Sequence, residues 1–311
     1  MKQRIPLFFS CDANYLPYLG VAVKSLIEHA NKDVIYDVNI LHVDMTKEDE
    51  TKLANLERDN IKLHFYSLKE KLEKISKKLD DVRDYYTQTI FYRLFIAEMF
   101  KDLKKAIYLD CDIIILSDLV ELYNTDLGDN ILGCVVDNVV ANNQDFKIYV
   151  KDTLDVEPQD YFNSGVLLIN LDAYRKYKVE EAFFDMINDY AFKSVAPDQD
   201  FLNFVCKNKK VMLEEKWNRM PINDNYNKEI NIIHYNMFMK PWTYDGVRYE
   251  EKFWEFANKT DFYSFIIDVK KNYSDEQRKN DLEGVKRVVA MCYDIMESKH
   301  TYRNKFSKYI A

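Results

Sequence analysis

Short apolar runs alternate with helical patterns from the first residues of the chain onward. The runs at residues 5–10, 38–43 and 61–66 have the length and apolar content of strands, and amphipathic segments separate them. The first such segment begins near Leu16, where Pro17 fits the opening turn of a helix because its missing N–H costs little there. This alternation predicts an α/β fold with a mostly parallel, twisted sheet flanked by helices.

The segment AIYLDCDIIIL, at residues 106–116, has the β-branched and apolar density of a buried central strand. A helix is expected before it, over about residues 89–101. Other expected elements are a charged, solvated helix at 68–81, strands at 131–136, 166–170 and 230–235, and a helix that begins near Asp198.

A domain boundary is expected near residues 258–261, giving a large domain over 1–258 and a helical extension over 259–311. One face of a helix in this extension carries Leu282, Val285, Val288, Val289, Cys292, Ile295 and Met296. The last thirteen residues, from Lys299, hold four Lys or Arg and no acid. This composition predicts a frayed, solvated tail, with weak peripheral contact to a membrane surface as the alternative.

Composition limits the partners of the chain. The formal net charge of -8 argues against nucleic-acid binding, because phosphate backbones select basic surfaces. None of the six glycines forms a GxGxxG or P-loop pattern, so an anionic ligand would need a local cation or a metal. Five cysteines without a CxxC pair indicate reduced structural thiols. No apolar stretch reaches the roughly 18 residues that span a bilayer, and we expect a cytoplasmic location.

Two carboxylates, Asp110 and Asp112, flank Cys111 inside the central apolar run. Residues i and i+2 of an extended backbone point to the same side, so both carboxylates would face one point. Like charges beside an apolar strand are costly to bury unless a cation lies between them. A divalent metal ion is therefore the simplest explanation for the pair, but a lone DxD motif is common and by itself favours a solvent-exposed strand end. The residues that support the motif decide between the two.

His234 follows another apolar run, in INIIHYNMFMKPW, and Lys240 comes six residues later. An isolated histidine of this kind often has only a structural role. Here the spacing would let the imidazole bind a metal while the ammonium meets a phosphate oxygen. Two carboxylates, an imidazole and a diphosphate would form a shell suited to Mn²⁺ or Mg²⁺.

Several segments in this order resemble the motifs of family 8 glycosyltransferases: FSCDANYLPYLGVAVKSL, YLDCDIII, DLGDN, YFNSGVLLINL, DQDFLN and HYNMFMKPW. The resemblance covers about residues 5–258 and is strongest to bacterial enzymes that transfer galactose or glucose to lipopolysaccharide or other surface glycans. It implies a GT-A fold, a UDP-glucose or UDP-galactose donor, Mn²⁺, and transfer with retention of the anomeric configuration. The nucleotide-binding half would be about residues 1–115 and the acceptor half about 116–258.

The resemblance also implies roles in binding the nucleotide and the metal. Asp110, Asp112 and His234 match the metal ligands, and Lys240 matches a lysine near the diphosphate. The residues around the nucleoside would be Asp12, Asn14 and Tyr15, with the Tyr15 ring stacked on uracil. From the residues alone, Asp12 could equally form an Asx turn and cap the following helix.

A second set of residues would meet the transferred sugar and the acceptor. Arg93 resembles an arginine that touches the donor sugar, although the residues alone favour an ion pair. Asn163 matches an asparagine facing that sugar, with a plain turn as its alternative. Asp198 and Gln199 match the pair at the reacting sugar, Asp198 at its hydroxyls and Gln199 beside the anomeric carbon, and Asp198 could instead be a helix N-cap. Asp137 aligns with an acidic residue between donor and acceptor.

The chain departs from the family pattern at Met237, where HYxGxxKPW commonly has glycine. The methionine side chain must point away or the loop must shift, which could weaken donor binding.

The sequence therefore predicts a retaining, metal-dependent transferase that moves a hexose from a UDP-sugar to a glycan or other hydroxyl acceptor. Two alternatives stay open at this point. A non-catalytic nucleotide-sugar binding protein is conceivable because of Met237. A DxD phosphohydrolase would use Asp110 as its nucleophile, although such enzymes usually carry the motif close to the N-terminus.

Overall fold

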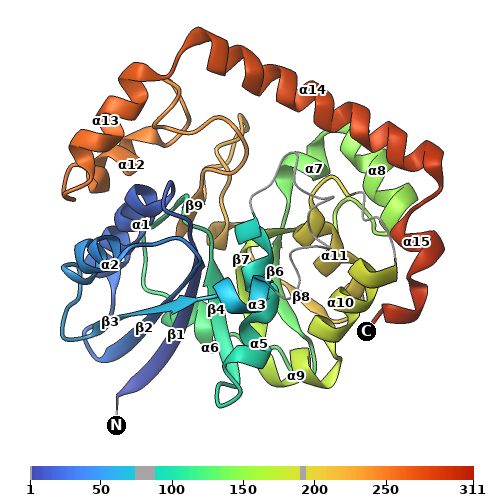
Figure 1. The fold of residues 1–311 in the computed structure, drawn as a ribbon, viewed down its shortest axis with the longest axis horizontal. Coiled ribbons are helices and arrows are strands. Elements are labelled where there is room, and N and C mark those ends of the chain that lie inside the picture. The colour runs from blue at the N-terminus through green and yellow to red at the C-terminus, as the bar shows by residue number, and fades with distance from the viewer. Residues whose placement is uncertain (1, 74–87, 190–193) are drawn as a thin grey trace. The chain divides into compact units, whose positions relative to one another are not determined.

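The computed structural model describes residues 2–73, 88–189 and 194–311 (Figure 1), and the chain divides into two compact units. The first unit comprises Met1–Glu70, Ala106–Thr125 and Glu214–Arg278, and the second comprises Lys71–Lys105, Asp126–Leu213 and Lys279–Ala311. Each unit is therefore assembled from segments that are far apart in the sequence.

Parallel strands in the order β3-β2-β1-β4 form the sheet of the first unit. Their bounds are Gln3–Ser10 for β1, Val34–His42 for β2, Ile61–Ser67 for β3 and Lys105–Leu109 for β4. Phe9 of β1 is in register with Leu109 of β4, so the segments after Ser10 and Leu109 begin at the same edge of the sheet. Open parallel sheets bind ligands at this edge, where the carboxyl ends of the strands lie.

A separate two-stranded sheet of the first unit joins β5 (Ile113–Ile115) to β9 (Ile232–His234) in antiparallel fashion. Ile113 is in register with His234, which brings residues 121 positions apart side by side. The helices of this unit are α1 (Leu16–His29), α2 (Lys47–Ala54), α6 (Val120–Asn124), the 3₁₀ turn η3 (Glu215–Trp217), α12 (Glu250–Ala257) and α13 (Tyr263–Asn272).

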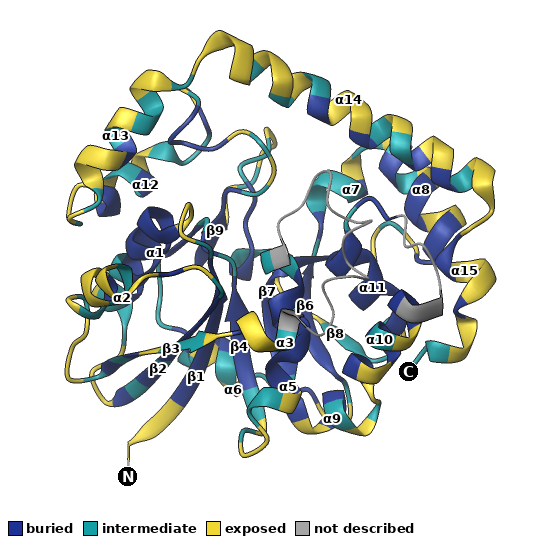
Figure 2. Ribbon diagram, in the orientation of Figure 1, coloured by how far each residue is buried: buried dark blue, intermediate teal, exposed yellow. Residues whose placement is uncertain are grey.

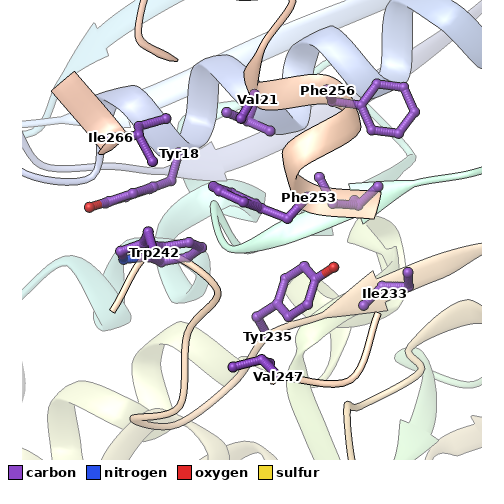
Figure 3. Packing of buried hydrophobic residues seen from close by; sticks show 11 residues of the cluster. Tyr18, Val21, Ile233, Tyr235, Trp242, Val247, Phe253, Phe256 and Ile266 are labelled. Atoms are coloured by element: carbon purple, nitrogen blue, oxygen red, sulfur yellow. The ribbon is translucent and has the colours of Figure 1, made fainter. Parts of the chain in front are cut away.

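Helix α1 packs on β5, α12 and α13, and a cluster of buried apolar and aromatic side chains fills the space between them (Figure 3). Trp242 stacks on Tyr18 of α1 with ring centroids 3.9 Å apart, and Phe253 of α12 tilts against the same indole at 4.9 Å. Aromatic pairs of this kind contribute about 0.5 to 1.5 kcal/mol beyond the burial of their area. The stack therefore anchors the segment that follows Lys240 to the first helix.

In the second unit, β6 (Leu132–Val136) pairs antiparallel with β7 (Phe162–Asn170) and parallel with the short strand β8 (Lys210–Met212). Strand β8 was not expected from the sequence. The helices here are η2 (Gln88–Phe95), α5 (Ile96–Met99), α7 (Asn138–Asn142), α8 (Gln144–Leu154), α9 (Leu171–Lys176), α10 (Val179–Asp189), α11 (Pro197–Val205), α14 (Asp275–Ser298, with its first residues in the first unit), α15 (Tyr302–Lys305) and η4 (Ser307–Tyr309).

The mixed α/β architecture with its mostly parallel sheet confirms the predicted fold class. Three predicted elements differ in detail. The run at 106–116 is two strands, because the chain bends at Asp110–Asp112 and leaves the first sheet for β5. The helix expected over 89–101 is a 3₁₀ segment followed by a single α-turn, and its aromatic and β-branched residues are weak helix formers. The strand at 230–235 shortens to β9.

Of the charged helix expected at 68–81, the structure describes α3 (Lys69–Glu73), and the remainder lies outside the described residues.

The C-terminal residues differ from their prediction in two ways. Helix α14 forms, but its apolar face is buried only in the C-terminal half, at Val288, Cys292 and Ile295, whereas Leu282 is 64% exposed (Figure 2). The frayed tail expected after Lys299 is wrong, since Thr301, Tyr302 and Phe306 are buried and the Ala311 N–H donates to the Val205 carbonyl. Apolar side chains between the basic residues dock this segment on its own unit.

All five cysteines are free thiols in buried positions, as expected for a structural role, and burial raises the pKa of Cys206 to about 12. Within the described ranges, none of the helices combines the length and apolar character that crossing a bilayer requires.

Candidate active site

Asp110, Asp112 and His234 converge in the first unit, where each offers one ligand atom within 4.8 Å of the others. The His234 Nε2 atom lies 3.2 Å from Asp112 Oδ1 and 3.7 Å from Asp110 Oδ2. The two carboxylates meet as the sequence predicts, but at a bend between β4 and β5 rather than along one extended strand. The register of β5 with β9 then places the imidazole beside them.

Asn218 orients the imidazole, a role that the sequence analysis missed. The distance from Asn218 Oδ1 to His234 Nδ1 is 2.9 Å, and a carbonyl oxygen only accepts. Nδ1 therefore carries a proton, and Nε2 faces the two carboxylates. Asn218 is held next to β9 because the neighbouring Arg219 exchanges backbone hydrogen bonds with Ile232 and His234.

The cation Lys240 completes this cluster. Its buried ammonium donates to Asp112 Oδ2 and to the Tyr235 carbonyl. Burial alone would raise the pKa of Asp112, but the adjacent Lys240 and His234 outweigh it and hold that pKa well below its usual range. Asp112 is therefore a carboxylate at neutral pH. The Tyr108 hydroxyl, which the sequence analysis also missed, donates to Asp110 Oδ1 at 2.9 Å.

The predicted nucleoside residues follow β1, at the sheet edge where Asp110 follows β4. Asp12 accepts a hydrogen bond from the Tyr15 backbone N–H at 3.0 Å, which is the turn role left open from the sequence. It does not cap α1, because Tyr15 occupies the N-cap position. Burial raises the pKa of Asp12. Asn14 is exposed, and Tyr15 is 36% exposed, packing edge-on against Tyr18. A partly exposed ring beside an exposed amide can receive a planar base.

The second unit gathers the other predicted residues into a buried hydrogen-bond network. Arg93 donates to the carbonyl and hydroxyl oxygens of Ser164 and pairs with Asp198, with Nε 3.2 Å from Oδ2. The ion pair expected as an alternative for Arg93 is therefore present. Asp198 is not a helix N-cap, since Ala196 occupies that position and Pro197 opens the helix. Its carboxylate accepts from the Ser164 hydroxyl at 2.9 Å.

Gln199, Asn163 and Asp137 belong to the same network. Asp137 Oδ2 accepts from Asn163 Nδ2 and from Gln199 Nε2, both at 3.1 Å. Gln199 Oε1 accepts from the Ser164 backbone N–H at 2.9 Å and from Asn163 Nδ2 at 3.1 Å. The other oxygen of Asp137 caps helix α7, a structural role that the sequence did not reveal. Both oxygens of this carboxylate therefore have protein partners.

Two further residues of this network, Tyr161 and Asp200, were missed although they flank predicted ones. Tyr161 stands two residues before Asn163, and Asp200 follows Gln199 directly. The hydroxyl of Tyr161 donates to Asp200 and accepts from Gln199 Nε2. The second acid of DQD and the tyrosine of YFNSG were available signals.

The loop between His234 and Lys240 keeps a backbone conformation that favours glycine. Met237 has a φ of 63°, in the left-handed region that side chains with a Cβ rarely adopt. Met237 is 44% exposed and Met239 is 58% exposed, so both side chains point outward. Met237 therefore adopts a backbone conformation that glycine would adopt freely, at some cost in strain.

A sequence profile described as "Glycosyl transferase family 8" matches residues 6–246. Among curated relatives, the lipopolysaccharide 1,2-glucosyltransferase of Escherichia coli (strain K12) is 26% identical over 294 residues, covering 85% of this chain and 83% of the relative. The general stress protein A of Bacillus subtilis (strain 168) is 27% identical over 227 residues, covering 70% and 74%.

Solved structures agree with the fold. The galactosyltransferase LgtC, in complex with donor and acceptor sugar analogs, has a TM-score of 0.67 at 26% identity, covering 83% of this chain and 96% of that one. The bifunctional WbbM has a TM-score of 0.74 at 23% identity, and the match covers 88% of this chain but only 52% of WbbM. These neighbours confirm the expected GT-A fold. Because the profile spans most of the 311 residues, the chain belongs to glycosyl transferase family 8.

Proposed function

We propose that this family 8 glycosyltransferase moves a hexose, glucose or galactose, from a UDP-sugar to a hydroxyl group of a glycan, with retention of configuration. The observation that carries the proposal is the cluster of Asp110, Asp112, His234 and Lys240, which can hold a divalent cation and an anionic leaving group. The names of the relatives support the substrate class, since one is a lipopolysaccharide 1,2-glucosyltransferase and another was solved with donor and acceptor sugar analogs.

The cluster suits a hard cation, and we propose Mn²⁺, with Mg²⁺ as the alternative. Two carboxylates and one oriented imidazole nitrogen match the donors that these ions take. A bound metal would supply Lewis-acid stabilisation of the leaving diphosphate. Lys240 has three N–H donors. Among the described residues, two of them donate to Asp112 and Tyr235, so the third can reach a phosphate oxygen.

The remaining roles follow from chemistry and exposure. Tyr15 offers a ring face to uracil, and Asp12 and Asn14 offer polar groups to the base or ribose. In the second unit, Arg93, Asn163 and Asp198 would bind the donor sugar, with Gln199 beside the anomeric carbon and Asp137 at the side of the acceptor. A glycan acceptor is proposed in general terms only.

Retention is assigned to same-face attack. The side chain proposed beside the anomeric carbon is the amide of Gln199, and amides are poor nucleophiles. An acid that hydrogen-bonds to this amide, Asp137, accepts N–H donors with both of its oxygens. The acceptor hydroxyl would therefore attack from the side of the leaving group, and the departing phosphate would take its proton.

We also propose that the catalytic domain spans residues 1–258, with 259–311 as an extension. The cytoplasmic location and the weak membrane contact through the basic C-terminus both stay predictions. Lys299, Arg303, Lys305 and Lys308 are exposed, which such a contact would need.

Replacing one metal ligand should abolish transfer. Asp110→Asn and Asp112→Asn each remove a negative charge from the cluster, and we expect a loss of at least about 100-fold in UDP release from the preferred donor. Release of UDP from UDP-glucose and UDP-galactose, with Mn²⁺, Mg²⁺ or EDTA, is the measurement. Unchanged thermal unfolding of both variants is the control for folding.

Turnover within a few-fold of wild type at saturating Mn²⁺ would contradict the metal assignment. Tight UDP-sugar binding with no turnover on any acceptor would favour a non-catalytic binding protein. Hydrolysis of a phosphomonoester without a nucleoside would favour a phosphohydrolase.

Removing the acceptor that orients His234 should weaken metal binding. Asn218→Leu keeps a similar volume but leaves Nδ1 without its partner, and we expect Mn²⁺ affinity to fall about 10- to 100-fold. The titration of free Mn²⁺ by electron paramagnetic resonance, on the full chain without donor, measures this directly.

Asn231→Leu is the matched control, because Asn231 is also buried near β9, and its Oδ1 has no hydrogen-bond partner in the part of the chain that the structure describes. Asn218→Asp should retain most of the affinity, since a carboxylate still accepts from Nδ1. Equal losses in Asn218→Leu and Asn231→Leu would show a general packing effect instead.

Restoring glycine at Met237 should relieve backbone strain. A left-handed conformation costs a residue with a Cβ about 1 to 2 kcal/mol, so Met237→Gly should raise the free energy of unfolding by about 1 kcal/mol. Closer approach of the backbone N–H to a diphosphate should also tighten UDP several-fold in the presence of Mn²⁺. Urea unfolding and calorimetric titration test the two effects.

Met239→Gly, in the same loop but without a positive φ, should lower stability or leave it unchanged. A gain of equal size in both variants would argue against local strain. Unchanged or weaker UDP binding by Met237→Gly would mean that the loop does not reach the phosphates through this residue.

A further inference from the structure

Asp200 is a fully buried acid in the first turn of α11, and its hydrogen-bond partners are all donors. Its Oδ1 accepts from the Tyr161 hydroxyl at 2.6 Å. Its Oδ2 accepts from the Tyr149 hydroxyl at 2.7 Å, from the Ser194 hydroxyl, and from the Ala196 N–H at 3.2 Å. No basic side chain is among these partners, so hydroxyl groups and a helix N-terminus compensate the carboxylate.

This arrangement fixes the direction of the Tyr161 hydroxyl. A carboxylate accepts and cannot donate, so the single proton of Tyr161 points to Asp200. The lone pairs of the same oxygen are then left to accept, and Gln199 Nε2 donates to it at 3.1 Å. An amide or hydroxyl in place of Asp200 could reverse the chain, because it could donate to Tyr161.

The Gln199 amide is thereby locked in one orientation. One N–H goes to Tyr161 and the other to Asp137 Oδ2, while Oε1 accepts from the Ser164 backbone N–H, which cannot change roles. If the amide flipped, its NH₂ group would face the N–H donors of Ser164 and Asn163. Its oxygen would face two other acceptors, the Asp137 carboxylate and the Tyr161 hydroxyl oxygen. Each lost partner of a buried polar group costs about 1 to 3 kcal/mol.

We propose that Tyr161 and Asp200 are positioning residues that hold the Gln199 amide in the single orientation required at the reacting sugar. The inference rests on the proposed function in one respect, since that function places Gln199 beside the anomeric carbon. Burial raises the pKa of Asp200, and its hydroxyl donors act in the opposite direction, as expected if they stabilise the carboxylate.

The chain contains a matched control in Tyr149. Both tyrosines are almost fully buried, at 1% exposure for Tyr149 and 2% for Tyr161, and both donate to Asp200. Each hydroxyl also accepts one N–H, but for Tyr149 the donor is the Val195 backbone and for Tyr161 it is the Gln199 side chain. Phenylalanine at either position therefore removes the same support from Asp200, and only one substitution frees Gln199.

The experiment compares Tyr161→Phe with Tyr149→Phe in the full chain, using donor kinetics with Mn²⁺ and thermal unfolding. Both variants should lose similar stability. Only Tyr161→Phe should lower kcat, by about 10- to 100-fold, while the KM for the UDP-sugar changes less than about three-fold. Equal losses of kcat in the two variants, or no loss in Tyr161→Phe, would overturn the proposal.

A second measurement does not depend on turnover. In ¹⁵N-labelled protein, the side-chain amide signals of Gln199, assigned by their loss in Gln199→Glu, should shift and exchange faster with solvent in Tyr161→Phe but not in Tyr149→Phe. Unchanged signals in Tyr161→Phe would overturn the positioning role. If wild type shows no turnover with any donor, the proposed function fails, and the amide signals still decide whether Tyr161 positions Gln199.

Discussion

The proposed chemistry depends on one electrostatic constraint, the need to hold Asp110 and Asp112 close together. Their mutual repulsion is offset in the structure by the ammonium of Lys240 and by the imidazole edge of His234. The antiparallel register of β5 with β9 supplies the histidine, and the stack of Trp242 on Tyr18 anchors the segment that carries the lysine. The fold of the first unit therefore brings Lys240 and His234, from late in the sequence, next to two acids from the first half of the chain.

The second unit handles its polar residues differently. Arg93 and Asp198 form an ion pair, but Gln199, Asn163 and Asp137 are joined to one another by neutral and charge-assisted hydrogen bonds. Rigidity costs such a network little stability, whereas one unsatisfied member costs it much, because a buried polar group without a partner is costly. A rigid amide suits a role in orienting a sugar better than a role in attacking it.

Features of the fold that depend on neighbouring residues could be predicted from the sequence. The strands β1, β2 and β3, the start of α1 at Leu16 and the convergence of Asp110, Asp112 and His234 follow from periodicity, proline position and the resemblance to the family. The break in the run at 106–116 was missed, because apolar density does not reveal where a strand changes sheets. The docking of Tyr302 and Phe306 was missed because the prediction of a solvated tail gave more weight to its basic residues than to these two apolar ones.

The partners of the site residues could not be predicted in the same way. Asn218 meets His234 across sixteen positions, and Tyr161 meets Asp200 across thirty-nine, so no spacing rule connects them. Asp137 is the opposite case, because it has a local role, the capping of α7, in addition to the role expected for it between donor and acceptor. The two roles do not exclude each other. Polar networks of this kind become visible only when the backbone has placed their members.

The most direct test of the account is the anomalous scattering of manganese in crystals grown with Mn²⁺ and UDP. The account predicts a single strong peak in the first unit, within bonding distance of Asp110, Asp112 and the Nε2 atom of His234, with Lys240 in contact with the diphosphate. Bound UDP with no manganese peak at these three side chains, or a peak coordinated by other residues, would contradict the metal-assisted mechanism.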